Sequence, residues 1–263
     1  MSGIQPNKRL GQHFLHDRNL QLKIVHALRA DAGARVVEIG PGTGALTTHL
    51  AERFERFLAI EVDERAVAYL DETLPGVDVR HVDVLKVDWP AVAAEGAGPL
   101  HVIGNLPYNI TSPIVFDLLD HDALFAEAVL MMQREVAERL VAGPGSKTYG
   151  ILSVLVQLQA DAELLFNVSR NVFFPKPDVE SSVVRLTFRR HEALAAGDEV
   201  SFLRTVVRTA FNQRRKTLRN SLRALTSARG VELPESVAGL RPETLSPADF
   251  VALARHLAPV IHE

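Results

Sequence analysis

The chain of 263 residues contains no cysteine. This absence excludes disulfide bonds, thiolate zinc sites and cysteine nucleophiles, and it favours an intracellular, cytoplasmic protein. No apolar run is long enough to cross a bilayer, and residues 1–9 lack the apolar centre of a secretion signal, so we expect no membrane attachment. The ten histidines show no spacing typical of metal ligands, and we expect no metal site.

Acidic residues are absent from one long stretch, residues 201–230. The formal net charge of -3 does not itself favour a nucleic-acid partner, but this stretch holds eight cations and no acid. A solvated helix face usually mixes both signs, so we interpret the stretch as a phosphate-binding surface. One continuous helix would align most of these arginines on one face, and a break near Asn212 would prevent that. The cations expected to contact phosphates are Arg214, Arg215, Lys216, Arg219 and Arg223.

Short apolar runs alternate with helix-like stretches over the first half of the chain. The hydrophobic content of 47% supports a large core. Strands that alternate with helices favour an α/β fold with a doubly wound, mostly parallel, Rossmann-like sheet. The expected strands cover residues 36–39, 57–61, 77–82, 100–104 and 128–132, and the expected helices cover residues 17–28, 65–74 and 134–141.

The pattern changes after residue 150. Residues 151–159 and 182–188 resemble strands, and we expect them to form an antiparallel pair that closes the sheet. The remainder is helical, with a strong helix start at Ser246, which is followed by proline and then by an acid. The sequence therefore predicts two domains, a larger one over residues 1–190 and a small all-helical one over residues 191–263.

A glycine-rich loop follows the first expected strand. Residues 36–44 read Val-Val-Glu-Ile-Gly-Pro-Gly-Thr-Gly and lead into a helix-like segment. In such sheets this position binds nucleotide-like ligands, but Gly40, Gly42 and Ala45 fit a dinucleotide site and an adenosyl site equally well. Glu61 ends the next strand about twenty residues on, where a carboxylate can accept hydrogen bonds from both ribose hydroxyls. Asp83, after the third strand, can accept one from an adenine amine.

The tetrapeptide Asn105-Leu106-Pro107-Tyr108 follows the fourth expected strand and leaves the same edge of the sheet. A dehydrogenase has no use for it, whereas methyl transfer to an aromatic amine does. The side-chain oxygen of Asn105 and a nearby carbonyl can take both hydrogens of the amine, so that its lone pair points at the methyl group. Tyr108 can stack on the base and hold it in line. An ordinary turn also uses these residue types.

Together, five motifs resemble those of the small-subunit ribosomal RNA adenine dimethyltransferases. The resemblance covers nearly the whole chain, and the motifs occur in the family's order. They lie at residues 10–15, 38–44, 105–108, 173–179 and 211–218.

What the resemblance implies is transfer of methyl groups from S-adenosylmethionine to the N6 amines of two adjacent adenines. These would lie in the 3′-terminal hairpin loop of small-subunit ribosomal RNA, within a 30S assembly intermediate, and the enzyme would act as a monomer. By the same resemblance, His13, Leu15, Gly40, Gly42, Glu61, Asp83 and Asn105 hold the cofactor. Asn105, Leu106, Pro107, Tyr108 and Phe173 surround the target base. The family most often has Asn at the position of His13.

Three other interpretations compete. A large-subunit ribosomal RNA adenine methyltransferase has similar catalytic motifs, but residues 213–218 argue against it. A nicotinamide-dependent dehydrogenase accounts for the glycines and Glu61 and leaves the tetrapeptide and the basic stretch without a role. A non-catalytic RNA-binding or assembly factor would not need an intact Asn105–Tyr108 motif.

Overall fold

The computed structural model describes residues 4–7, 10–189 and 198–258. The chain forms two compact units, Met1–Ala137 with Ala160–Arg189, and Glu138–Gln159 with Arg190–Glu263. The second unit thus takes in Glu138–Gln159, which the division at residue 190 had assigned to the larger domain. None of the helices in the described ranges is both long and apolar enough to span a membrane.

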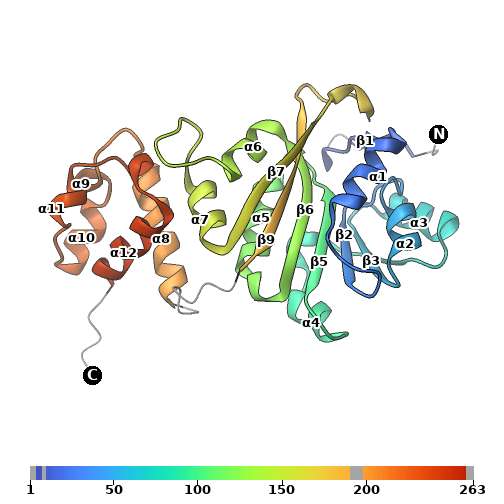
Figure 1. The fold of residues 1–263 in the computed structure, drawn as a ribbon, viewed down its shortest axis with the longest axis horizontal. Coiled ribbons are helices and arrows are strands. Elements are labelled where there is room, and N and C mark those ends of the chain that lie inside the picture. The colour runs from blue at the N-terminus through green and yellow to red at the C-terminus, as the bar shows by residue number, and fades with distance from the viewer. Residues whose placement is uncertain (1–3, 8–9, 190–197, 259–263) are drawn as a thin grey trace. The chain divides into compact units, whose positions relative to one another are not determined.

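The first unit is built on a seven-stranded sheet in the order β4-β3-β2-β5-β6-β9-β7 (Figure 1). Neighbouring strands from β4 to β6 are parallel, and β9 pairs antiparallel with both β6 and β7. The expected α/β sheet with antiparallel closing strands is confirmed. Its strands are β2 (Arg35–Ile39), β3 (Arg56–Glu61), β4 (Asp78–His81), β5 (Leu100–Asn105), β6 (Phe125–Gln133), β7 (Ala160–Val168) and β9 (Ser181–Phe188).

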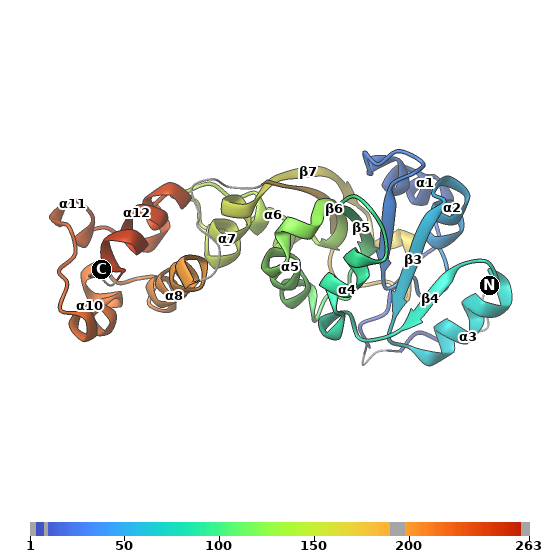
Figure 2. The same ribbon diagram turned by 90° about the horizontal axis from the view of Figure 1, so that it is seen from below.

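Helices cover both faces of this sheet, with α1 and α2 on one side and α4 and α5 on the other (Figure 2). Ile24 and Val25 of α1 and its C-cap residue Leu28 are buried and join one core cluster with Ile103 and Val129 from the sheet. Burial on both faces explains why β2 is apolar throughout except at Arg35 and Glu38. The helices are α1 (Arg18–Ala27), α2 (Thr47–Arg53), α3 (Glu64–Thr73), α4 (Trp89–Ala94), α5 (Thr111–Asp120) and α6 (Arg134–Leu140), with short 3-10 turns at η2 (Val84–Lys86), η3 (Asp122–Leu124) and η4 (Arg170–Val172).

A second, two-stranded sheet joins the N-terminal segment to the proline-rich loop. It consists of β1 (Phe14–Leu15) and β8 (Phe173–Phe174), which pair antiparallel. Leu15 and Phe173 are both buried in the core cluster. This small sheet fixes the N-terminal segment against the body of the first unit.

The strand expected over residues 151–159 was wrong, because this run is the helix α7 (Ile151–Gln159). Seven of its nine residues are buried, and its six apolar residues point to several sides of the helix, so the run has no clear helical or strand period to read. The strand that pairs with β9 is instead the next segment, β7. Buried and exposed residues alternate only in part along β7. Because β7 contains the polar residues Asp161, Glu163 and Asn167, it does not form an apolar run in the sequence.

The second unit is helical in its described part. The helix start at Ser246 is confirmed, because its hydroxyl accepts from the backbone N–H of Asp249, whose carboxylate accepts from that of Ser246. The basic stretch is not one helix, since α8 ends at Asn212. Besides α7, the helices are α8 (Asp198–Asn212), α9 (Leu218–Ser221), α10 (Arg223–Arg229), α11 (Glu235–Ala238) and α12 (Pro247–Leu257), with a 3-10 turn at η5 (Pro242–Thr244).

Candidate active site

The site lies where the strand order reverses. The chain runs outward from β2 to β3 and β4, then returns to β5, which pairs with the other side of β2. Ile39 is opposite Gly104, so the glycine loop and the tetrapeptide leave adjacent strands at the same sheet edge. A Cβ at Gly104 would lie 2.5 Å from the carbonyl oxygen of Ile39. Only glycine therefore allows this close approach of the two strands.

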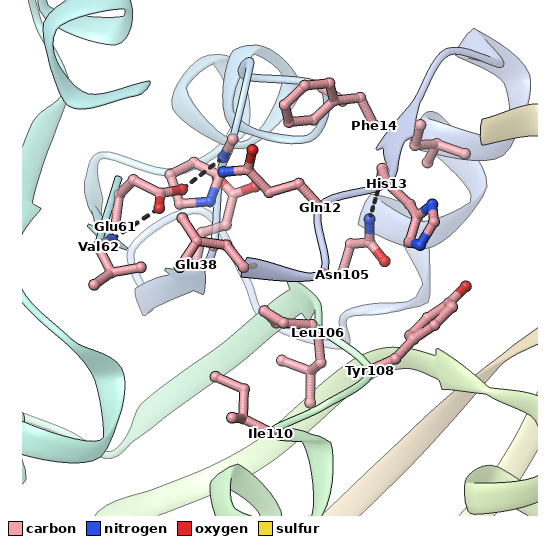
Figure 3. Close-up of a pocket in the computed structure, with 18 of the residues that line it drawn as sticks. Gln12, His13, Phe14, Glu38, Glu61, Val62, Asn105, Leu106, Tyr108 and Ile110 are labelled. Atoms are coloured by element: carbon pink, nitrogen blue, oxygen red, sulfur yellow. Dashed lines mark hydrogen bonds between the residues drawn. The ribbon is translucent and has the colours of Figure 1, made fainter. Parts of the chain in front are cut away.

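A cavity of about 260 Å³ opens at this edge (Figure 3). The tetrapeptide lines it from one side and the glycine loop from another. The structure thus brings together every residue that the sequence assigned to the cofactor, although their roles stay predictions. These lining residues are His13, Leu15, Gly40, Gly42, Glu61, Asp83 and Asn105.

The glycine loop is held in place by the residue expected to bind ribose. The backbone N–H of Gly42 donates to Glu61 Oε2 at 3.0 Å. The other carboxylate oxygen accepts from the N–H groups of Val62 and Asp63 at 2.8 and 2.9 Å. Gly42 has a φ of +56°, and a Cβ there would lie 3.0 Å from the ring of Phe14. Burial raises the pKa of Glu61, against the lowering effect of these hydrogen bonds.

Glu38 is a further acid of the cavity, which sequence reasoning treated only as part of the glycine motif. Its side chain is buried and accepts a hydrogen bond from Thr47 Oγ1 at 2.8 Å. Burial raises its pKa to about 8, and the nearby carboxylate of Glu61 adds to this rise. The sequence could have singled out Glu38, because an acidic residue in a strand that is buried on both faces requires a structural or functional explanation.

A polar network that the sequence did not suggest anchors the segment before β1. Gln12 Nε2 donates to Asp63 Oδ2 at 2.9 Å, and Gln12 Oε1 accepts from the backbone N–H of Asn7 at 2.8 Å. Arg65 binds the same carboxylate at 2.6 Å and lowers the pKa of Asp63. The network ties Gln12, which lines the cavity, to the N-cap residue of α3.

The tetrapeptide and the N-terminal motif meet directly (Figure 3). Asn105 Nδ2 donates to the carbonyl of His13 at 3.0 Å, which orients the amide. The rings of His13 and Tyr108 stack with centroids 5.3 Å apart. His13 Nδ1 lies 2.7 Å from the carbonyl oxygen of Pro175, so this nitrogen carries the proton. The hydroxyl of Tyr108 bonds Ser181 Oγ at 2.6 Å, and burial raises the pKa of this phenol.

Phe173 is not among the residues that line the cavity. Its side chain is 3% exposed and packs in the core cluster with Leu15. The next residue, Phe174, is 62% exposed. The structure therefore does not bring Phe173 to the expected position beside a target base.

The five cations expected to bind phosphates divide into two groups. Arg214 pairs with Glu243 at 3.0 Å and donates to the carbonyl of Ser146, so it holds two segments of the second unit together. Arg219 pairs with the exposed Glu235 at 3.0 Å. Arg215, Lys216 and Arg223 are exposed and form no ion pair within the described part of the chain. These three are the cations left available to a partner.

No group of His, Asp or Glu able to hold a metal ion occurs among the residues that the structure describes.

Comparison with known proteins identifies the family. The family model described as ribosomal RNA adenine dimethylase matches residues 3–257. The chain belongs to this family. The Salinibacter ruber protein named ribosomal RNA small subunit methyltransferase A is 53% identical, over 97% of this chain and 86% of its own length. The protein of the same name from Chlorobaculum tepidum is 46% identical, over 97% of this chain and 90% of its own.

Solved structures agree with this assignment. A dimethyladenosine transferase from Plasmodium falciparum is similar with a TM-score of 0.76 and 27% identity, over 92% of this chain and 96% of that one. The 23S rRNA methyltransferase ErmE follows with a TM-score of 0.65 and 26% identity, over 93% and 99%. The chain is therefore a ribosomal RNA adenine dimethyltransferase, and neither the dehydrogenase nor the non-catalytic interpretation fits.

Glu38→Gln tests the buried acid. The carboxyl group has a pKa of about 8 when folded, above its ordinary 4.5, so it gives up its proton later in the folded protein than in the unfolded chain. Wild-type stability should therefore fall as the pH rises from about 4.5 to about 8, by up to about 1.4 kcal/mol per pH unit. The amide does not titrate and still accepts from Thr47. We expect the variant to gain in unfolding temperature relative to wild type between pH 5 and pH 8, and a gap independent of pH would contradict the raised pKa.

Proposed function

We propose that the chain transfers methyl groups from S-adenosylmethionine to the N6 amines of two adjacent adenines in the 3′-terminal hairpin loop of small-subunit ribosomal RNA. One observation carries the proposal: Asn105–Tyr108 lines the same cavity as the glycine loop and Glu61. The names of the curated relatives support the small subunit as the source of the RNA. We further propose that the enzyme is a cytoplasmic monomer that acts on a 30S assembly intermediate, since the hairpin forms part of that particle.

The cavity fits the proposed cofactor. Glu61 presents a fixed, buried carboxylate to which ribose hydroxyls can donate. Asp83 Oδ1 accepts from the backbone N–H of Leu85 at 3.1 Å, which leaves the other oxygen for an adenine amine. When bound, S-adenosylmethionine supplies an electrophilic methyl group on a positively charged sulfur. Glu38 lies in the same cavity, and a nearby positive charge favours its ionised form.

The tetrapeptide prepares the amine for attack. Because Nδ2 of Asn105 donates to His13, its Oδ1 is the atom that can accept a hydrogen from N6. The carbonyl of Pro107 already accepts from Ile110 N–H and Thr111 Oγ1, which leaves the carbonyl of Leu106 for the second hydrogen. Both contacts favour a pyramidal nitrogen with its lone pair toward the methyl group. The ring of Tyr108, held by Ser181, offers a face on which the base can stack.

The helical unit supplies phosphate contacts. Arg215, Lys216 and Arg223 are exposed cations without acidic partners in the described residues, so they position RNA without reading its sequence. Arg219 can contribute only by exchanging its partner Glu235 for a phosphate. Arg214 is held by Glu243 and is the weakest of the five candidates.

Glu61→Gln is expected to weaken cofactor binding. The amide keeps one acceptor oxygen but loses the charge and the second acceptor. A hydrogen bond to a charged group is worth about 1.5 to 3 kcal/mol, so affinity for S-adenosylmethionine should drop about tenfold to a hundredfold. Titration calorimetry on the folded variant measures this drop, while RNA affinity without cofactor serves as the control and should not change. Unaltered cofactor affinity would remove Glu61 from the site.

Asn105→Ala is expected to abolish methyl transfer while RNA binding persists. Asn105→Asp retains an acceptor oxygen and should keep more of the rate than the alanine variant. Single-turnover experiments with saturating enzyme separate this chemical step from binding. A normal single-turnover rate in Asn105→Ala would refute the role proposed for this side chain.

Replacing Arg215 and Arg223 together by Ala is expected to flatten the salt dependence of RNA binding. Each lost phosphate contact reduces the slope of log K against log salt by about 0.7 to 0.9. The matched control is Arg219→Ala. Because Arg219 pairs with Glu235, its replacement should reduce the salt slope by less than the loss of one free phosphate contact. Filter binding across salt concentrations gives the slopes. An equal slope in wild type and double variant would show that these arginines only solvate the surface.

A further inference from the structure

Phe174 is the most exposed of the large apolar side chains in the described residues, at 62%. Single exposed apolar residues are common and by themselves need no explanation. The position of this one is specific, because it lies in β8 next to the loop that contacts His13.

The strand pairing fixes the side to which Phe174 points. Phe14 is opposite Phe174, and Leu15 is opposite Phe173. Side chains of paired residues project to the same side of a sheet, and successive residues alternate. Since Leu15 and Phe173 point into the core, Phe14 and Phe174 share the other side. Phe14 lines the cavity and packs against Gly42. Phe174 does not line the cavity itself, but it projects beside the ring of Phe14, which does.

The backbone around Phe174 is held in place. The carbonyl of Pro175 accepts from His13 Nδ1 at 2.7 Å, and His13 stacks on Tyr108. Pro175 and Pro177 restrict the loop further, because the proline ring fixes φ. A ring presented by a rigid loop loses little conformational entropy when a ligand stacks on it.

We propose that Phe174 is a stacking platform for the nucleobase next to the target adenine. The inference rests on the proposed function, which brings an RNA loop to this cavity. When an adenine leaves its stack to reach a methyl donor, its neighbour loses a stacking partner and exposes a π-face to water. An exposed aromatic ring beside the cavity replaces that partner, and it does so for any base.

The charges near the ring are compatible with an RNA strand. Lys176, two residues on, is exposed and can meet a phosphate. Of the acids in the same loop, Glu180 is engaged by Arg170, whose backbone N–H donates to its carboxylate at 2.9 Å. Asp178 is exposed, so ions in the solvent can screen its negative charge.

A double-mutant cycle between protein and RNA tests the platform. The full chain is loaded with S-adenosylhomocysteine, which prevents turnover, and its affinity is measured for the hairpin with two adjacent adenines. Two further hairpins replace one or the other adenine by an abasic site, so that the remaining adenine is the target and its neighbour has no base. The protein variants are Phe174→Ala and Phe174→Trp. The matched control is Val179→Ala, since Val179 is an apolar residue of the same loop and is 43% exposed.

Phe174→Ala should bind the intact hairpin about tenfold more weakly, while Phe174→Trp and Val179→Ala bind like wild type. With one of the two abasic hairpins the effect of Phe174→Ala should vanish, because the base that stacks there is missing. Equal loss on all three hairpins, or no loss on the intact one, would overturn the proposal. A separate incubation of wild type with S-adenosylmethionine and undermethylated small subunits tests the proposed function, since absence of dimethyladenosine there would refute that function and not the stacking cycle.

Discussion

The structure depends on the parallel pairing of β2 with β5. Gly104 lets the two strands approach so closely that any side chain at this position would collide with the carbonyl of Ile39. The glycine loop and Asn105 thereby leave the sheet side by side, although 61 positions of sequence separate Gly44 from Asn105. The glycine loop and the tetrapeptide owe their adjacent positions to this one backbone contact. Their relative position is rigid because it is set by a buried sheet and not by a loop.

The cavity built at this edge concentrates acid groups in a poorly solvated place. Burial raises the pKa values of both Glu38 and Glu61, which disfavours their charged forms. Three backbone N–H groups support Glu61, whereas a single hydroxyl supports Glu38. The positively charged sulfur of the proposed cofactor, S-adenosylmethionine, would favour the ionised forms of both acids.

The sequence predicted the parallel sheet, and it predicted that the expected cofactor residues gather at one edge of that sheet. Local signals decide both features, namely β-branched runs, glycines and polar residues at strand ends. It did not predict α7, because a fully buried run of nine residues reads the same as helix or strand. It did not separate Phe173 from Phe174, since the register of a two-residue strand decides which ring is buried. The partners of Arg214 and Arg219 lie 29 and 16 residues away, and only the tertiary fold brings them together.

The central claim is that one cavity binds a methyl donor and presents it to adenines of small-subunit ribosomal RNA. The most direct measurement incubates the enzyme with isotopically labelled S-adenosylmethionine and undermethylated small subunits, and then analyses the nucleosides of the recovered RNA. The account predicts label in dimethyladenosine at two adjacent positions of the 3′-terminal hairpin. Label only in monomethyladenosine, or only in RNA of the large subunit, would contradict it.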